Sequence, residues 1–271
     1  RFIRMYLKDF QQPVTLRFAR MELVRNQWRT YLQSLEDDLV PNAEFTEFDV
    51  NAVNIEENSS RCPFNYVLPP DIQREQLISA FQGLQNEQSI TMEVKNLRDG
   101  DSRAIYKTLN LDLRNYERMK MFVHAEETGY SRCGDDPEDI NCDPDLQDGD
   151  LTIFMRLGSD FTQNYYEYEI PLTISDTLLL DSLGLGAVPT QAYVEEVWKR
   201  ANEFDFELDW FIQAKKERNR TGSLAQEFEF NEPLLGDSTR MEHKIKIRGN
   251  PNLGYVKTVM IGIRNPKDEN N

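Results

Sequence analysis

A regular alternation of apolar and polar residues, with a period of two, recurs along much of this chain. In Tyr165–Leu172, for example, Tyr166, Tyr168 and Ile170 share one face, and the residues between them share the other. Successive side chains of a β-strand point to opposite faces, so this pattern predicts strands with one buried face. The segments predicted as strands are Ile90–Leu97, Ala104–Leu113, Arg118–Ala125, Leu151–Leu157, Tyr165–Leu172, Lys244–Arg248 and Val256–Arg264.

Helices are predicted only at the periphery of this β structure. Asp71 is suited to cap a short helix near 71–82. Thr190 is suited to cap a helix that runs to about Phe204, and a second helix is predicted from about 206 to 218.

The predicted fold class is therefore mainly β, an antiparallel β-sandwich with a few peripheral helices. The order strand, long loop, strand, strand over residues 118–172 is similar to jelly-roll, galactose-binding-like modules. We expect one sandwich domain over residues 51–271. Residues 1–50 are predicted to be an extended segment that either joins this domain or belongs to a neighbouring sheet.

Composition and charge exclude several classes of protein. The 271 residues carry 31 Lys and Arg against 47 Asp and Glu, a net charge of −16. An acidic surface disfavours binding to nucleic acid and to anionic membranes, so we expect no nucleic-acid partner. The longest apolar stretch, Ile174–Val188, is interrupted by Asp176 and Asp181 and is too short for a membrane helix. The segment itself is therefore predicted not to span a membrane.

Residues 53–70, VNIEENSSRCPFNYVLPP, fit neither the helical nor the strand period, and we call them the proline tract. Each of Pro63, Pro69 and Pro70 fixes a backbone angle, so the tract is predicted to be a loop held in a defined shape. A rigid loop loses little entropy when it docks. The predicted interaction residues are Asn54, Ile55, Glu56, Glu57, Asn58, Tyr66, Val67, Leu68, Pro69 and Pro70.

The same tract resembles the SprA/Sov family, the very large outer-membrane translocon proteins of the type IX secretion system in Bacteroidetes. The resemblance rests on Val53–Asn58 followed by Tyr66–Pro70. Further similar stretches, in order, are Phe18–Arg29, Asp112–Glu126, Arg156–Pro171 and Gly249–Pro266. Family members are several times longer, so the resemblance implies a portion of a larger polypeptide.

The resemblance also implies a function without catalysis. The parent would form the outer-membrane channel through which folded cargo leaves the cell, and it would support gliding motility where that occurs. This segment would be a soluble insertion on the periplasmic or extracellular face, and its partners would be other type IX secretion subunits and secreted cargo proteins. No enzymatic activity is expected.

An acidic loop at residues 134–150 is the candidate for a metal site. Asp143, Asp145, Asp148 and Asp150 supply the oxygen ligands that calcium prefers, although their spacing does not match an EF-hand. A solvated loop without metal explains the same residues, so calcium is a possible cofactor and no other is expected. Cys133 and Cys142 flank this loop and could form a disulfide outside the inner membrane.

Three other groups of residues could suggest catalysis or sugar binding, but a structural role explains each of them. Glu167 and Glu169 share a strand face at a spacing compatible with an inverting glycosidase, but any strand can show such a pair. His124 ends a predicted strand and lacks a nucleophile motif around it. Tyr166 and Tyr168 fit core packing, and their alternative is a platform for sugars, which would make the chain a carbohydrate-binding β-sandwich module of a secreted protein.

Overall fold

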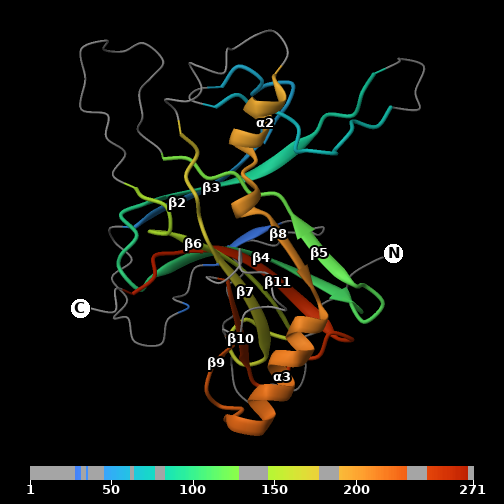
Figure 1. Ribbon diagram of the computed structural model, residues 1–271, viewed down its shortest axis with the longest axis vertical. Helices are drawn as coiled ribbons and strands as arrows, with labels where there is room; N and C mark the ends of the chain where they lie inside the picture. The colour runs from blue at the N-terminus through green and yellow to red at the C-terminus, as the bar shows by residue number, and fades with distance from the viewer. Residues whose placement is uncertain are drawn as a thin grey trace, which may run out of the picture.

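The computed structural model describes residues 28–31, 35, 46–61, 64–76, 83–127, 146–176, 189–230 and 243–267. Its centre is a seven-stranded antiparallel sheet with the strand order β1-β4-β11-β6-β7-β10-β9 (Figure 1). In that order the strands are β1 Arg29–Tyr31, β4 Ser102–Leu111, β11 Val256–Arg264, β6 Thr152–Gly158, β7 Tyr165–Pro171, β10 Lys244–Arg248 and β9 Phe228–Phe230.

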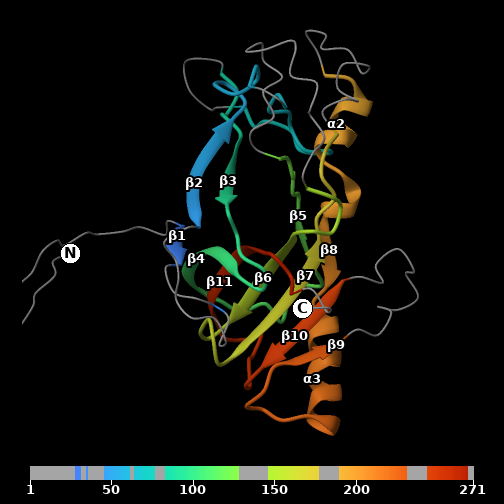
Figure 2. The ribbon, with the colours of Figure 1, turned by 90° about the vertical axis from the view of Figure 1, so that its left-hand side faces the viewer.

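A second layer covers one face of this sheet. It consists of the antiparallel ribbon of β5 (Arg118–Met121) and β8 (Phe204–Glu207), and of helix α3 (Asp209–Thr221) (Figures 1 and 2). Between the layers, Tyr168 stacks on Phe206 with ring centroids 4.1 Å apart. The inward residues of the alternating strands thus form the main core, as the period of two predicts.

A separate ribbon and a smaller core lie at one end of the molecule. β2 (Glu47–Asn54) and β3 (Gln88–Lys95) pair antiparallel over their whole length (Figure 2). Beyond them, the proline tract packs against helix α2 (Gln191–Val197). This second core has its own set of buried residues, which are Phe64, Tyr66, Val67, Tyr193, Val197 and Trp198.

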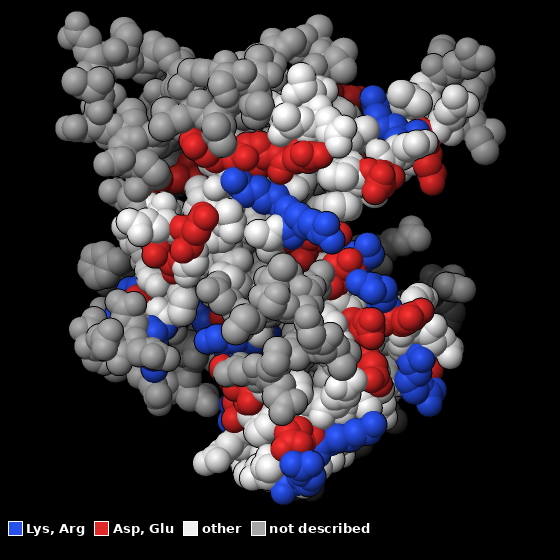
Figure 3. Space-filling view, in the orientation of Figure 1, with Lys and Arg blue, Asp and Glu red and all other residues white. Residues whose placement is uncertain are grey.

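The fold class is confirmed: the protein is mainly β, with a large antiparallel sheet, a second layer and peripheral helices. The predicted bounds of β10 and β11 are those observed, whereas the strand predicted over Arg118–Ala125 ends at Met121. Among the described residues, no helix is long and apolar enough to cross a membrane. On the face that Figure 3 shows, the acidic and basic side chains of the described residues are interspersed.

Three helix predictions need correction. The helix that begins after Thr190 ends at Val197 rather than near Phe204, because the alternating residues of β8 pair with β5 and bury both Phe204 and Phe206. The second helix therefore begins later, at Asp209, and ends at Thr221.

Residues 71–76 are not helical, and residues 77–82 lie outside the described part. Asp71 has a φ of 63°, a left-handed conformation, whereas a residue that caps a helix N-terminus is typically extended. Gln76 instead forms a β-bridge with Leu84. The division into residues 1–50 and 51–271 remains a prediction.

Candidate functional site

The first half of the proline tract is a turn closed by two asparagines. Asn54 accepts hydrogen bonds at its side-chain oxygen from the backbone N–H groups of Glu56 (3.1 Å) and Glu57 (2.9 Å). In return, the Asn58 side chain accepts from the Asn54 N–H at 2.9 Å, and the Asn58 N–H donates to the Asn54 carbonyl at 2.9 Å. These side chains satisfy the backbone locally, so the turn has a single defined shape.

The second half of the tract is anchored on α2. The Trp198 indole N–H donates to the Val67 carbonyl at 3.0 Å, and the Asn65 N–H donates to the Tyr193 hydroxyl at 2.8 Å. Tyr66 and Val67 are buried in the second core, so two of the predicted interaction residues pack inside this protein. Trp198 is one of three tryptophans in the chain, and no local sequence pattern links it to the tract.

Exposed and half-buried residues of the tract, together with two neighbours, form what we call the tip surface. Its members are Glu56, Glu57, Leu68, Pro69, Pro70, Ile72 and Leu84. Ile72 and Leu84 leave 40% and 46% of their surface exposed. Arg74 connects the parts of this surface, because its guanidinium donates to Glu56 (3.1 Å) and to the carbonyls of Leu84 (3.2 Å) and Gln85 (2.7 Å).

A polar cluster holds the middle of the tract against the segment that follows β5. Arg61 donates to the Phe64 carbonyl at 3.2 Å and forms an ion pair with Glu126. His124 lies between Glu126, 3.0 Å from Nε2, and the Val197 carbonyl, 2.7 Å from Nδ1. Burial lowers the pKa of His124 to about 4; the Val197 carbonyl opposes this shift, and the charge of Arg61 adds to it. His124 is thus a hydrogen-bonded structural residue, as expected.

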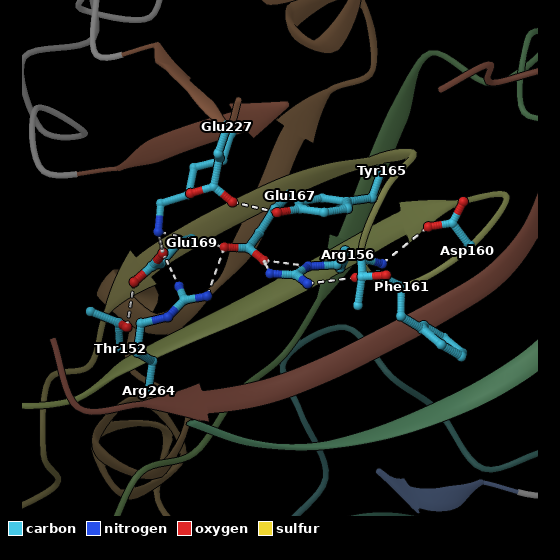
Figure 4. A network of polar contacts seen from close by, with 11 residues as sticks. Thr152, Arg156, Asp160, Phe161, Tyr165, Glu167, Glu169, Glu227 and Arg264 are labelled. Atoms are coloured by element: carbon cyan, nitrogen blue, oxygen red, sulfur yellow. Dashed lines mark hydrogen bonds and ion pairs between the residues drawn. The ribbon is translucent and has the colours of Figure 1, made fainter. Parts of the chain in front are cut away.

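The face of the central sheet opposite the main core carries a buried ion network (Figure 4). Arg156 donates to Glu167 through Nε at 2.7 Å, and Arg264 donates to the other oxygen of Glu167 at 3.0 Å. Glu169 accepts from Thr152 at 2.6 Å and from Lys246 at 2.6 Å, and it also pairs with Arg264. The network therefore connects the neighbouring strands β11, β6, β7 and β10.

Glu167 of this network is held in its charged form. Burial alone would raise the pKa of Glu167, but the charges of Arg156, Arg264 and Lys246 outweigh burial and hold that pKa well below its usual range. Glu167 is 0% exposed and Glu169 is 3% exposed. This arrangement ties strands together, and neither carboxylate is placed on an open surface as a glycosidase pair would be.

The candidate metal ligands and disulfide cysteines belong to the acidic loop, a different part of the chain from the tract. Asp150 accepts from the Gln147 N–H at 2.8 Å and stabilises a local turn, whereas Asp148 accepts from the Ile174 N–H at 2.8 Å and bonds to the segment after β7. Asp143, Asp145, Cys133 and Cys142 lie outside the described residues. Within the described ranges, no group of three His, Cys, Asp or Glu side chains is arranged to hold a metal. Calcium binding and the disulfide therefore stay predictions.

The tyrosines considered for sugar stacking lie in the main core. Tyr166 is 2% exposed and Tyr168 is 0% exposed. The Tyr166 hydroxyl donates to the Pro251 carbonyl at 3.1 Å, and burial raises the pKa of Tyr166 to about 12. These two rings therefore give no platform for a carbohydrate, and core packing explains them.

Comparison with known proteins identifies the family. The SprA_N family model, described as a motility related/secretion protein, matches residues 1–271. The chain belongs to this family. The resemblance to SprA/Sov proteins is thereby confirmed, and the protein is related to motility and secretion. A search of curated proteins finds no match.

Proposed function

We propose that this SprA_N segment is a non-catalytic scaffold and docking domain of a type IX secretion translocon in the outer membrane of Bacteroidetes. It lies on the periplasmic or extracellular face and binds other subunits of the machine and secreted cargo. It acts by binding and steric exclusion, without forming or breaking covalent bonds. In gliding members of the group, the same channel supports motility.

The observation that carries this proposal is the rigidity of the tip surface. The two-asparagine turn, the Trp198 anchor and the Arg74 contacts fix the backbone beneath it. Leu68, Pro69 and Pro70 are half-buried, and Ile72 and Leu84 beside them are exposed. Apolar side chains on a fixed backbone can dock with a small loss of conformational entropy.

The proposal is tested in the intact parent protein in cells. Replacing both Pro69 and Pro70 with glycine leaves every buried contact of Trp198 in place but loosens the backbone of the tip surface. We expect secretion to fall while the amount of folded protein in the outer membrane stays unchanged. The matched control is Pro266→Gly, because Pro266 is also half-buried but lies far from the tract in the sequence.

A second pair of variants tests the apolar contacts themselves. Ile72→Asp and Leu84→Asp place charges on exposed positions, so we expect little effect on folding and a loss of co-purified secretion subunits. Normal secretion and normal co-purification with all of these variants would contradict docking through the tip surface.

A further inference from the structure

The outer edge of the β2–β3 ribbon is unpaired among the residues that the structure describes. The Ile55 N–H donates to the Glu87 carbonyl at 3.0 Å, which continues the register of Asn54 with Gln88. In an antiparallel ladder only every second residue directs its N–H and C=O at the partner strand. Counting back from Ile55, residues 53, 51, 49 and 47 face β3, and the even-numbered residues face outward.

The turn at the end of β2 agrees with this assignment. Asn54 is even-numbered, and both its N–H and its carbonyl bond to Asn58, away from β3. Phe48, Val50 and Ala52 therefore direct their N–H and C=O groups out of the ribbon. These backbone groups have no hydrogen-bond partner within the described part of the chain. Figure 2 places β2 at the outer margin of the molecule, with β3 on its inner side.

An unpaired edge of this length is a template for another strand. β2 and β3 each have eight residues, and a ribbon of only two strands is marginally stable in water. A third strand would satisfy the outward N–H and C=O groups and widen the ribbon. Edge pairing of this kind is a common way for proteins to capture extended segments.

The two faces of the ribbon define what such a strand must look like. One face is apolar, because Phe48 lies opposite Val94, Val50 opposite Met92, and Ala52 opposite Ile90. Ile90 is 42% exposed, so this face is accessible near the Asn54 end of the ribbon.

The other face is acidic. It carries Glu47, Asp49 and Glu93, against which Lys95 is the one basic side chain of the two strands, paired with Glu93 at 3.0 Å. A strand added to β2 must therefore alternate apolar residues on one face with basic residues on the other. A second copy of β2 fits badly, since it would bring two sets of like charges onto the same face.

We propose that β2 accepts a third strand from another protein, an extended segment in which apolar residues alternate with Lys or Arg. Backbone pairing with Phe48, Val50 and Ala52 provides the affinity, and Glu47 and Asp49 select basic side chains. This edge is a different surface from the tip surface, and it has its own partner.

The test uses the complete 271-residue chain and two nine-residue peptides, one alternating valine with lysine and the other alternating valine with glutamate. Fluorescence anisotropy measures binding, and hydrogen exchange read by mass spectrometry locates it. We expect the lysine peptide to bind at least tenfold more tightly and to slow exchange within residues 47–54. Equal binding of the two peptides, or protection elsewhere without protection of β2, would overturn the proposal.

Two variants separate the backbone and charge contributions. Val50→Pro removes one outward N–H without removing a bond to β3, and proline is tolerated on such an edge. We expect about tenfold weaker binding of the lysine peptide with an unchanged circular dichroism spectrum. Asp49→Lys keeps every backbone group and should shift the preference toward the glutamate peptide, which keeps the proposal testable if Val50→Pro does not fold.

The controls are Ile72→Asp and Leu84→Asp of the tip surface, which should bind the lysine peptide like the unaltered chain. If those variants lose secretion but keep peptide binding, the two surfaces act separately. If folded Val50→Pro and Asp49→Lys both bind the peptides as the unaltered chain does, the edge is not the site.

Discussion

The indole of Trp198 reaches the carbonyl of Val67 across 131 residues of sequence, and the bond is 3.0 Å long. Trp198 is also one of the largest side chains of the second core, where it packs edge-on to Tyr66. The residue that caps the C-terminus of α2 thus supplies both a hydrogen bond and apolar contact to the proline tract, which has no regular hydrogen bonding of its own at residues 64–68.

Replacing Trp198 with phenylalanine should loosen this tract. The change leaves the buried Val67 carbonyl without its donor, and we expect a loss of about 1–3 kcal/mol in unfolding free energy. Hydrogen exchange at residues 64–68 should accelerate. The control is Trp210→Phe, because Trp210 is equally buried, at 7% exposed against 8%, yet its indole nitrogen has no hydrogen-bond partner among the described residues. Equal destabilisation by both changes would show that ring volume alone matters.

Glu167→Gln should be strongly destabilising. It leaves Arg156 and Arg264 buried with one compensating charge fewer, and breaking a buried pair in this way costs about 3–5 kcal/mol. Urea denaturation measures the effect. The control is Glu207→Gln, where the Arg118 partner is 3.8 Å away and the side chains of Arg118 and Glu207 are 45% and 39% exposed, so little change is expected. A small effect of Glu167→Gln would mean that water reaches the network.

His124 should make stability depend on pH between about 6.5 and about 4. An unfolded histidine titrates near 6.5, whereas the folded pKa is about 4, so between these values the unfolded state binds more protons. Unfolding free energy should therefore fall as pH is lowered through this window, and the contribution is fully present above it. NMR titration of the two histidines, assigned with His124→Gln, gives the pKa directly.

The same titration of the Arg61→Gln variant tests what lowers the pKa of His124. It removes a positive charge that lowers the pKa of His124 and leaves Glu126 without its ion-pair partner. We expect the pKa of His124 to rise. A His124 resonance in the unaltered chain that titrates at 6.5 or above would contradict the assignment of a neutral ring.

Gly249 should tolerate no side chain, for a reason beyond its backbone angle. Its φ is 66°, and an added Cβ would lie 1.9 Å from the Gln163 carbonyl oxygen. Gly149 has a similarly positive φ of 91° but open space around it. Gly149→Ala should therefore cost only the backbone strain, about 1 kcal/mol, and Gly249→Ala clearly more. Thermal melting of the two variants separates the cost of the steric clash from the cost of the backbone conformation.

A strand could be predicted from the sequence where the strand and its two neighbours in the sheet bury side chains on the same face. Lys244–Arg248 alternates Ile245 and Ile247 inward, and the bounds predicted for this strand are those observed. β8 was not found, because its four residues, Phe204–Glu207, fall between two helical segments and are too few to establish a period. Tertiary pairing with β5 decides its conformation.

The candidate site was predictable only in part, since its partners are distant in sequence. Local pattern places Glu167 and Glu169 on one face of a strand, but Arg264, about a hundred residues later, decides that they are buried ion-pair partners. In the tract, prolines indicate a fixed shape, and the sequence does not reveal that Tyr66 and Val67 face inward toward α2. Long-range packing supplies that information.

The β2–β3 ribbon touches both cores, since Met92 packs against the main core and Val53 against the second one. A two-stranded ribbon has little stability of its own and depends on both attachments. When either core unfolds, the ribbon loses one of its two attachments, and the other core is then destabilised as well. The two halves of the molecule should therefore melt as one cooperative unit, with a single transition by calorimetry.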